Sequence, residues 1–406
     1  MSKLLCHVKD MDAKLVNIIK DFSLLGVLSW PKEIMHKFLK NANKGNIKLP
    51  EVEYNKKNHD HKISEINQFL INLGNDNHPA ISFLTKTAES YRDAYYMLNG
   101  VGTKDITEFS LKLYGSPKNI VTGYKHSSLK IAHQFLHIIN EYKYTIPKEV
   151  NIFSAREFKQ KIRPLINENI DQIVDPINII IDKNISAKAA ATSEGIKIRY
   201  GAKFSKNDIY QLFHHEVMIH ALTKINGKKQ PILKTLAYNS PRTTETQEGL
   251  ATFSEYITMS MELMRLKRIV LRIIAISMAE DGADFFDLFK FFCEHGQDHE
   301  ESYFSAMRIF RGGYPNGGII FYKDSVYLQG LIKITAFLKS SVHKGLIPDI
   351  ALLFCGKLNT DDISDFKVLL EEGYITEPVY IPDWLRHNNI LVSHLAINDL
   401  LGKFNR

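Results

Sequence analysis

The sequence predicts a predominantly α-helical protein with a small β-element. Apolar residues recur every three or four positions over most of the chain, which is the spacing of one helical face. The pattern changes in the centre, where 177–181 is rich in β-branched isoleucine and 196–199 alternates apolar with basic residues. Alternation with a period of two is typical of strands, so we expect a small hairpin or sheet there.

Several helices can be placed by the residues at their ends. A helix over Pro79–Leu98 opens with proline, which suits a first helical turn, and stops before Gly100. Further helices are expected over Asp208–Ile225 and Thr246–Arg265, and the glycine-rich segment Gly312–Gly318 predicts a long loop. The helical pattern therefore extends over both halves of the chain.

Length and composition are those of an ordinary globular protein. The 406 residues are 44% hydrophobic and 24% charged, with 52 basic and 45 acidic residues. This modest positive excess does not indicate a nucleic-acid partner, because nucleic-acid binders concentrate Lys and Arg on one face. The length suits more than one domain, and we expect an N-terminal helical region over 1–150 and a second domain over 151–406.

Cysteine usage and the apolar segments predict a cytoplasmic protein without a membrane partner. Cys6, Cys293 and Cys355 are odd in number and far apart, so they form no disulfide framework. The N-terminus lacks the apolar run of a signal peptide. The longest apolar stretch, Ile269–Ala279, is interrupted by Arg272 and is too short to cross a bilayer.

A pair of histidines flanking an acidic residue is the most informative motif. Zinc binds imidazoles and carboxylates, and catalytic zinc sites use three protein ligands. In the familiar zinc-peptidase motif two residues separate the Glu from the second His, whereas three separate Glu216 from His220 here. On a regular α-helix His215 and His220 then lie about 140° apart. A local π-helical turn, with about 4.4 residues per turn, brings them to one side, so we expect a widened turn between them.

A third ligand is expected from the next helix. The segment 247–251 reads Gln-Glu-Gly-Leu-Ala and opens a helix that can cross beside the first one. Glu248 then completes a set with His215 and His220 and leaves a fourth coordination position open. Gly249 would allow a neighbouring backbone to approach closely.

These motifs together resemble one family. The segments His215–His220, Thr246–Ala251, Arg308–Gly313, Phe321–Asp324 and Tyr327–Gly330 are similar to those of the flavohaemoglobin expression-modulating QEGLA-motif family. Animal members of this family include the microtubule-associated tyrosine carboxypeptidase, which removes the C-terminal tyrosine of α-tubulin. The resemblance covers most of the chain from about residue 60.

The resemblance implies an α-helical, zincin-like metallopeptidase whose catalytic domain is 151–406. It places one zinc ion per chain on His215, His220 and Glu248, and it makes Glu216 the general base that activates the attacking water. The implied reaction is a carboxypeptidase cleavage that releases Tyr, or another bulky or acidic residue, from a peptide or protein C-terminus. A tubulin-like acidic tail is a partner by analogy only.

A carboxypeptidase must also hold the terminal carboxylate of its substrate. Arginine does this through a bidentate fork and lysine as a point charge, so Arg308, Arg311 and Lys323 are candidates. The alternative is a structural ion pair, for instance with Asp324 or Glu301. Both interpretations are compatible with the sequence.

Two tyrosines are candidates for stabilising the tetrahedral intermediate. Tyr322 and Tyr327 can donate hydrogen bonds to the oxygen that gains charge, although either can equally be a core residue with a satisfied hydroxyl. The basic stretch Lys224–Lys229 is expected to be a solvated turn, with attraction of an acidic peptide as the alternative.

Two other classes of function remain open at this level. The first is a regulatory binding protein whose metal is vestigial or structural, in which case a fourth protein ligand such as His214 would close the site. The second is a basic nucleic-acid binder. A second metal site at His295 and His299, near Cys293, is not favoured because their polar surroundings predict an exposed loop.

Overall fold

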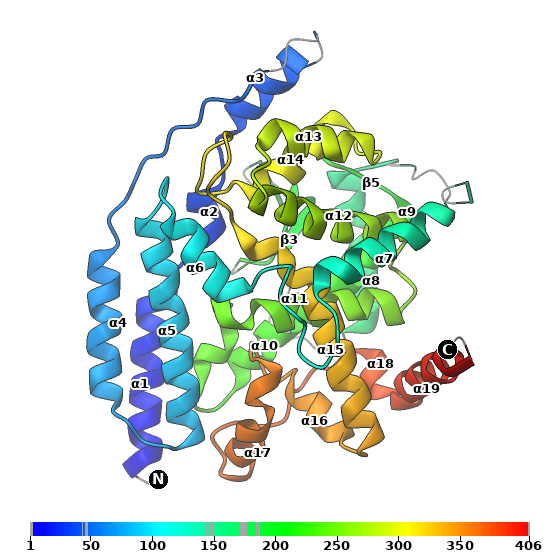
Figure 1. Ribbon diagram of the computed structural model, residues 1–406. Helices are drawn as coiled ribbons and strands as arrows, with labels where there is room; N and C mark the ends of the chain where they lie inside the picture. The colour runs from blue at the N-terminus through cyan, green and yellow to red at the C-terminus, as the bar shows by residue number, and fades with distance from the viewer. Residues whose placement is uncertain are drawn as a thin grey trace. The chain divides into compact units, whose positions relative to one another are not determined.

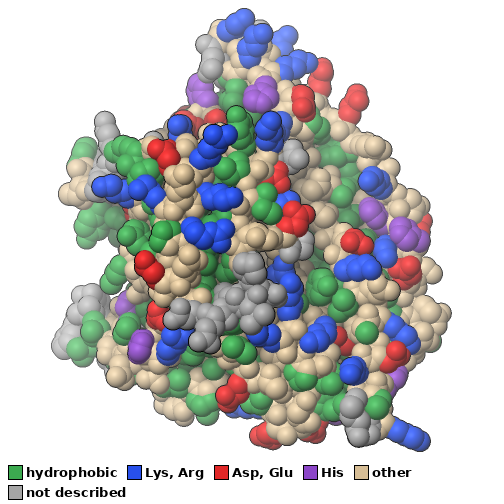
Figure 2. Space-filling model, turned by 180° about the vertical axis from the view of Figure 1, so that it is seen from behind, with side chains coloured by type: hydrophobic (Ala, Val, Ile, Leu, Met, Phe, Trp, Pro, Cys, Tyr) green, Lys and Arg blue, Asp and Glu red, His purple; other side chains and the backbone are tan. Residues whose placement is uncertain are grey.

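The structure is a computed structural model that describes residues 3–404 except 43, 45–47, 143, 146–149, 151, 171–176, 184, 186 and 193. Most of these residues are helical and the strands are few and short, which confirms the predominantly α-helical class with a small β-element (Figure 1). No helix of the described residues combines the length and apolar character needed to cross a bilayer. In the view of Figure 2, Lys and Arg side chains are interspersed with Asp and Glu side chains.

Contacts along the chain define two compact units, each built from separate segments. Unit 1 comprises Met1–Glu141, Ser240–Glu245 and Lys267–Gln329, and unit 2 comprises Tyr142–Asn239, Thr246–Leu266 and Gly330–Arg406. The expected division into 1–150 and 151–406 stays a prediction, and residues 146–149 and 151 at its boundary lie outside the described part of the chain.

The regular elements among the described residues of unit 1 are helices. Its helices are α1 (Lys3–Ile19), α2 (Leu24–Leu28), α3 (Lys32–Ala42), α4 (Asp60–Leu73), α5 (Pro79–Asn99), α6 (Asp105–Tyr114), α7 (Ser128–Glu141), most of α12 (Leu263–Glu280), α13 (Phe285–Glu294), α14 (His299–Ile309) and the short 3-10 turns η3 (Pro241–Thr243) and η4 (Tyr322–Ser325). Helices α1, α4 and α5 pack side by side (Figure 1). Helix α5 begins at the expected proline and is followed by Gly100, as its end residues predict.

Unit 2 contains the strands. Its elements are β1 (Phe153–Ser154), α8 (Ala155–Asn169), β2 (Ile179–Asp182), β3 (Ala189–Ala191), β4 (Ile196–Arg199), β5 (Lys203–Phe204), α9 (Lys206–Leu212), the π-helix η1 (Phe213–Ala221), α10 (Leu222–Lys229), η2 (Lys234–Ala237), α11 (Thr244–Ile257), α15 (Val326–His343), α16 (Ile347–Leu352), η5 (Thr360–Asp362), α17 (Ile363–Glu371), α18 (Asp383–Arg386) and α19 (Asn388–Phe404). Helices α11 and α15 each begin in segments of unit 1 and continue in unit 2.

The three-stranded sheet of unit 2 has the order β2-β4-β3. The two expected strands, β2 and β4, are parallel and pair Ile179 with Ile196, so they form a sheet but not a hairpin with each other. A hairpin does exist between β4 and β3, which runs antiparallel and pairs Ala191 with Ile196. Strand β3 was not expected, because its three alanines have low strand propensity.

The prediction of one continuous helix over Thr246–Arg265 is wrong. Helix α11 ends at Ile257, and α12 starts at Leu263. Between them Met259 has a φ of 55°, a left-handed conformation that few non-glycine residues adopt. The amides of Ser260 and Met261 both donate to the Glu255 carbonyl, so backbone hydrogen bonds stabilise the turn that the apolar spacing did not reveal.

A buried apolar cluster lies beneath the helix that carries the two-histidine motif. Ile179, Ile196 and Ile198 of the sheet belong to the same cluster as Phe158 of α8 and Val217 of η1, and all five are buried. The sheet and α8 therefore support one side of η1. Burial of large aliphatic and aromatic side chains stabilises such a contact by about 1.5–3 kcal/mol per residue.

Candidate metal centre

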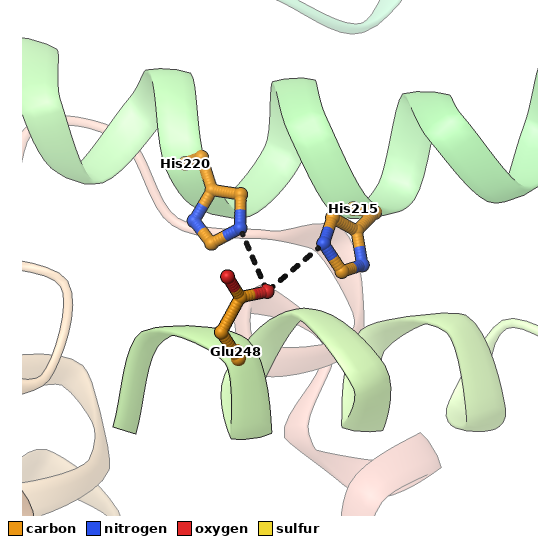
Figure 3. A group of neighbouring side chains, drawn as sticks. All are labelled: His215, His220 and Glu248. Carbon is orange, nitrogen blue, oxygen red and sulfur yellow. Dashed lines mark ion pairs between the residues drawn. The ribbon is translucent and has the colours of Figure 1, made fainter. Parts of the chain in front are cut away.

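The two histidines lie on a π-helix, which confirms the expected widened turn. The helix starts as α9, where Ser205 and Asp208 form a capping box, and continues without a break through η1 and α10. Because the π-helical turn takes more residues than an α-helical one, the side chains of His215 and His220 project from the same side of the helix (Figure 3). Their ring centroids are 5.0 Å apart.

Glu248 of α11 points at both imidazoles (Figure 3). Its Oε2 atom lies 3.4 Å from Nε2 of His215 and 3.6 Å from Nε2 of His220. One ligand atom from each of the three residues falls within 4.8 Å of the others. The structure thus brings the three predicted ligands together.

The position of Glu248 depends on a close approach of two backbones at the next residue. A Cβ atom added to Gly249 would lie 2.4 Å from the carbonyl oxygen of Gly330 in α15. Real Cβ atoms do not come this close to backbone, so only glycine fits between the helices. The neighbour that approaches Gly249 is α15, and this contact fixes the position of α11 beside Glu248.

We expect Gly249→Ala to destabilise the protein by about 1–3 kcal/mol or more, because neither backbone can yield without moving a helix. Chemical denaturation of the purified variant measures this loss. Unchanged unfolding free energy would show that the two helices separate easily and that Gly249 does not fix Glu248.

Buried polar groups hold the π-helix against α11. The ammonium of Lys357 donates to the His220 carbonyl at 2.9 Å and to the side-chain oxygen of Gln247 at 2.8 Å. The same oxygen of Gln247 accepts a hydrogen bond from the hydroxyl of Thr223 at 3.0 Å. Burial lowers the pKa of Lys357 to about 7. Gln247 therefore fixes the geometry around Glu248 from the adjacent position.

The other nitrogen of His215 is held by a buried carboxylate. Nδ1 of His215 lies 2.6 Å from Oε1 of Glu255, which is fully buried, and the guanidinium of Arg265 donates to both oxygens of Glu255. Burial raises the pKa of Glu255, but the charges of Arg265 and His215 outweigh it and lower this pKa to about 2. A carboxylate on the second nitrogen orients a metal-binding histidine and makes it a stronger ligand.

Glu255 is thus a positioning residue for His215, and Glu255→Gln tests that role. We expect about 10–100-fold weaker zinc binding, because the amide orients the imidazole less strongly than the carboxylate. We also expect a loss of about 3–5 kcal/mol in unfolding free energy, since the substitution breaks the ion pair between Arg265 and the buried carboxylate of Glu255.

The comparison variant is Arg265→Met, which leaves the carboxylate on His215. It should lower stability but weaken zinc binding less than Glu255→Gln does. Competition with a fluorescent chelator and chemical denaturation measure the two quantities. Equal effects of both variants on zinc affinity would contradict a specific action of Glu255 on His215.

The candidate base, Glu216, lies between the three predicted ligands and the sheet. Its Oε2 atom accepts a hydrogen bond from the backbone amide of Ala191 in β3 at 2.7 Å. Its Oε1 atom lies 4.0 Å from Nε2 of His215. The residue is 7% exposed. The edge of the sheet therefore orients a carboxylate beside the three predicted ligands.

The three donors fit a zinc ion in kind and in placement. Two imidazoles and one carboxylate form the ligand set of many catalytic zinc sites. Burial lowers the pKa of His220, which favours its metal-binding neutral form. Burial also lowers the pKa of His215, but hydrogen bonds to Glu248 and Glu255 outweigh it and raise this pKa well above its usual value. A metal would therefore displace a proton from His215.

No fourth His, Cys, Asp or Glu of the described residues joins this group. His214, the residue considered as a closing ligand, instead packs its ring edge-on against Phe213, with centroids 5.1 Å apart. Three protein donors leave a position for water or substrate on a tetrahedral ion.

Four of the five predicted substrate-binding residues gather in unit 1 around Asp324. The guanidinium of Arg308 forms a two-point ion pair with Asp324, with one nitrogen–oxygen distance of 2.7 Å. This is the structural alternative considered for Arg308. The ammonium of Lys323 lies 5.6 Å from the ring centre of Tyr327. The fourth residue, Arg311, is 1% exposed.

Asp324 lies at the centre of this cluster of unit 1. Burial raises the pKa of its carboxyl group, but the charges of Arg308, Arg272 and Arg311 outweigh burial and hold this pKa well below the usual range. Burial and the charge of Arg308 lower the pKa of Arg311 to about 9.

The fifth residue, Tyr322, makes a different contact within unit 1. Its hydroxyl donates to Oε1 of Glu280 at 2.9 Å, and the residue is buried. Burial and Glu280 raise its pKa. This is the satisfied hydroxyl that was the alternative for this residue.

Three groups that lie near the predicted ligands were not expected from the sequence. Glu255 lies two helical turns after Glu248 on the same helix, so its spacing could have indicated a second carboxylate on that face. Lys357 and Ala191 are far from the motif in sequence, and no local pattern connects them to it.

A comparison with protein families places almost the whole chain in one of them. Residues 36–401 match a family described as microtubule-associated tyrosine carboxypeptidase. A comparison with curated proteins finds no match. The matched range contains both histidines, Glu216, Glu248 and the cluster around Asp324. The chain therefore belongs to the microtubule-associated tyrosine carboxypeptidase family.

Proposed function

We propose that the protein is a zinc-dependent carboxypeptidase that releases a single C-terminal residue from a peptide or protein. The observation that carries the proposal is the convergence of His215, His220 and Glu248, with Glu216 beside them. Membership of the carboxypeptidase family supports the same reaction. One zinc ion per chain is the cofactor that this donor set fits best.

Zinc held by His215, His220 and Glu248 would act as a Lewis acid that polarises a carbonyl and lowers the pKa of a bound water. Glu216 removes a proton from the attacking water with the oxygen that faces His215, and later gives that proton to the leaving amine. The amide of Ala191 holds the other oxygen of Glu216 in place. Burial of Glu216 keeps competing solvent away from the proton that it carries.

The family name supports C-terminal tyrosine as the first residue to test, and the acidic tail of tubulin as a candidate substrate. Binding of the terminal carboxylate by Arg311 or Lys323 stays a prediction from the sequence. The roles of Arg308, Tyr322 and Tyr327 in substrate binding remain predictions. The family name also makes the cytoplasm the compartment in which we expect the enzyme to act.

Mass spectrometry of peptide digests tests this proposal. The zinc-loaded protein is incubated with peptides that share one sequence and end in Tyr, Phe, Glu or Lys. We expect loss of one C-terminal residue from at least one of them, and no loss after treatment with a chelator. Internal cleavage would indicate an endopeptidase, and intact peptides under all conditions would contradict a peptidase function and favour a regulatory binding protein.

A further inference from the structure

A pocket of about 280 Å³ lies within unit 2 at the end of the β3–β4 hairpin. Ala191 and Thr192 line it on the sheet side, and Ala221, Lys224 and Lys228 line it on the helix side. We call it the Lys224 pocket. It is large enough for a side chain or a chain terminus of a peptide, and none of the roles assigned above uses it.

The Lys224 pocket borders the candidate metal centre. Ala191, which lines it, donates its amide hydrogen bond to Glu216. Ala221, on the opposite wall, directly follows the predicted ligand His220. A peptide whose scissile bond lies at Glu216 can therefore extend a neighbouring residue into this pocket.

Two lysines give the pocket its charge. Lys224 and Lys228 are one helical turn apart on α10, and both line it. The acidic residue on the wall, Glu194, already pairs with Lys197 at 3.3 Å. The pocket therefore presents positive charge to a bound group.

The ammonium of Lys224 is held in a defined position. It donates to the carbonyl oxygen of Thr192 at 2.9 Å, across the pocket wall. Burial and the nearby charge of Lys228 lower its pKa to about 8, so a bound anion would stabilise the charged form. A fixed, partly buried ammonium binds a carboxylate more strongly than a fully solvated one does.

We propose that the Lys224 pocket binds a carboxylate of the peptide substrate through Lys224, with Lys228 adding to the attraction. The proposal rests on the proposed peptidase function. The carboxylate has two possible sources, the C-terminal α-carboxylate and the side chain of an acidic residue next to the cleaved bond. Both offer the same ligand, so the experiment must separate them.

Binding measurements separate the two sources. The zinc-loaded Glu216→Gln protein, which should bind without cleaving, is titrated by calorimetry with four peptides of one sequence. One peptide carries a free C-terminus and a Glu next to the terminal residue, one replaces that Glu with Gln, one is amidated at the C-terminus, and one carries both changes. Each titration is repeated with Lys224→Gln added. Lys229→Gln on the same helix is the matched control, because Lys229 does not line the pocket.

We expect Lys224→Gln to weaken binding of the first peptide by about 10–100-fold, which corresponds to the loss of one charge-assisted hydrogen bond. Lys229→Gln should leave binding unchanged. The effect of Lys224→Gln should vanish for the Gln peptide if the side chain is the ligand, and for the amidated peptide if the α-carboxylate is.

Two outcomes would overturn the pocket proposal. In the first, Lys224→Gln leaves the affinity for every peptide unchanged. In the second, Lys224→Gln weakens binding of the peptide that carries both changes as much as it weakens binding of the unmodified peptide. Failure of the peptidase function has a different signature, because the protein with Glu216 intact would then leave the same peptides uncleaved. If the protein with Glu216 intact cleaves the peptides and Lys224→Gln leaves their affinities unchanged, the pocket proposal is wrong and the peptidase function stands.

Discussion

Replacing Glu216 with Gln is expected to reduce peptide turnover by about 10²–10⁴-fold while leaving zinc bound. The amide has nearly the same shape as the carboxylate and can still accept the hydrogen bond of the Ala191 amide. It cannot remove a proton from water, so the loss should fall on kcat and not on KM. Steady-state kinetics with the cleaved peptide measures the change.

The zinc content of the Glu216→Gln protein is the control for this prediction. We expect the same stoichiometry as in the unchanged protein, because Glu216 is not among the three predicted ligands. A variant that retains zinc and cleaves at the original rate would show that another group acts as the base. A variant that loses zinc would show that Glu216 is itself a ligand.

Replacing Glu248 with Gln is expected to abolish both zinc binding and activity. The neutral amide oxygen is a much weaker zinc ligand than a carboxylate, so we expect zinc affinity to fall by more than about 100-fold. Glu248 also lies beside the buried imidazole of His215, whose charged form it stabilises. Inductively coupled plasma mass spectrometry of the dialysed protein measures the zinc that remains.

The exposed residue Glu371 provides a matched control on α17, because Glu371→Gln makes the same chemical change away from the cluster. It should retain zinc and activity. Saturating zinc should also raise the melting temperature of the unchanged protein and of Glu371→Gln, but not of Glu248→Gln. Equal zinc retention by both variants would remove Glu248 from the ligand set.

The local geometry of the candidate metal centre was predictable because the motif constrains it strongly. The spacing of His215 and His220 does not suit an α-helix, so a shared ligand role required the π-helical turn that the structure shows. The small sheet followed from the period of two in 196–199 and from the isoleucines before it. In both cases the pattern acts over a few residues.

Features that depend on distant segments were not predictable. The partner of Gly249 is the backbone of Gly330, and the donor to the His220 carbonyl is Lys357. Each contact joins segments with no shared periodicity. The end of α11 was also missed, because the apolar spacing continues through Met259 although the backbone turns there.

The roles predicted for the substrate-binding residues also depend on contacts with distant segments. Arg308 was proposed from its charge and its place near a glycine-rich loop, and the structure pairs it with Asp324. A charged residue in a motif can stabilise the fold, bind a ligand or do both, and the sequence carries no signal that separates these roles. The Lys224 pocket illustrates the converse, since a stretch expected to be a solvated turn is part of helix α10 and lines a cavity.

Anomalous X-ray scattering at the zinc absorption edge tests most directly whether His215, His220 and Glu248 bind one ion. Crystals of the zinc-loaded protein should show one strong peak per chain, about 2.0–2.2 Å from Nε2 of each histidine and from a Glu248 oxygen. Water or substrate should occupy the remaining position. A peak elsewhere, or a fourth protein donor closing the site, would contradict a catalytic zinc centre.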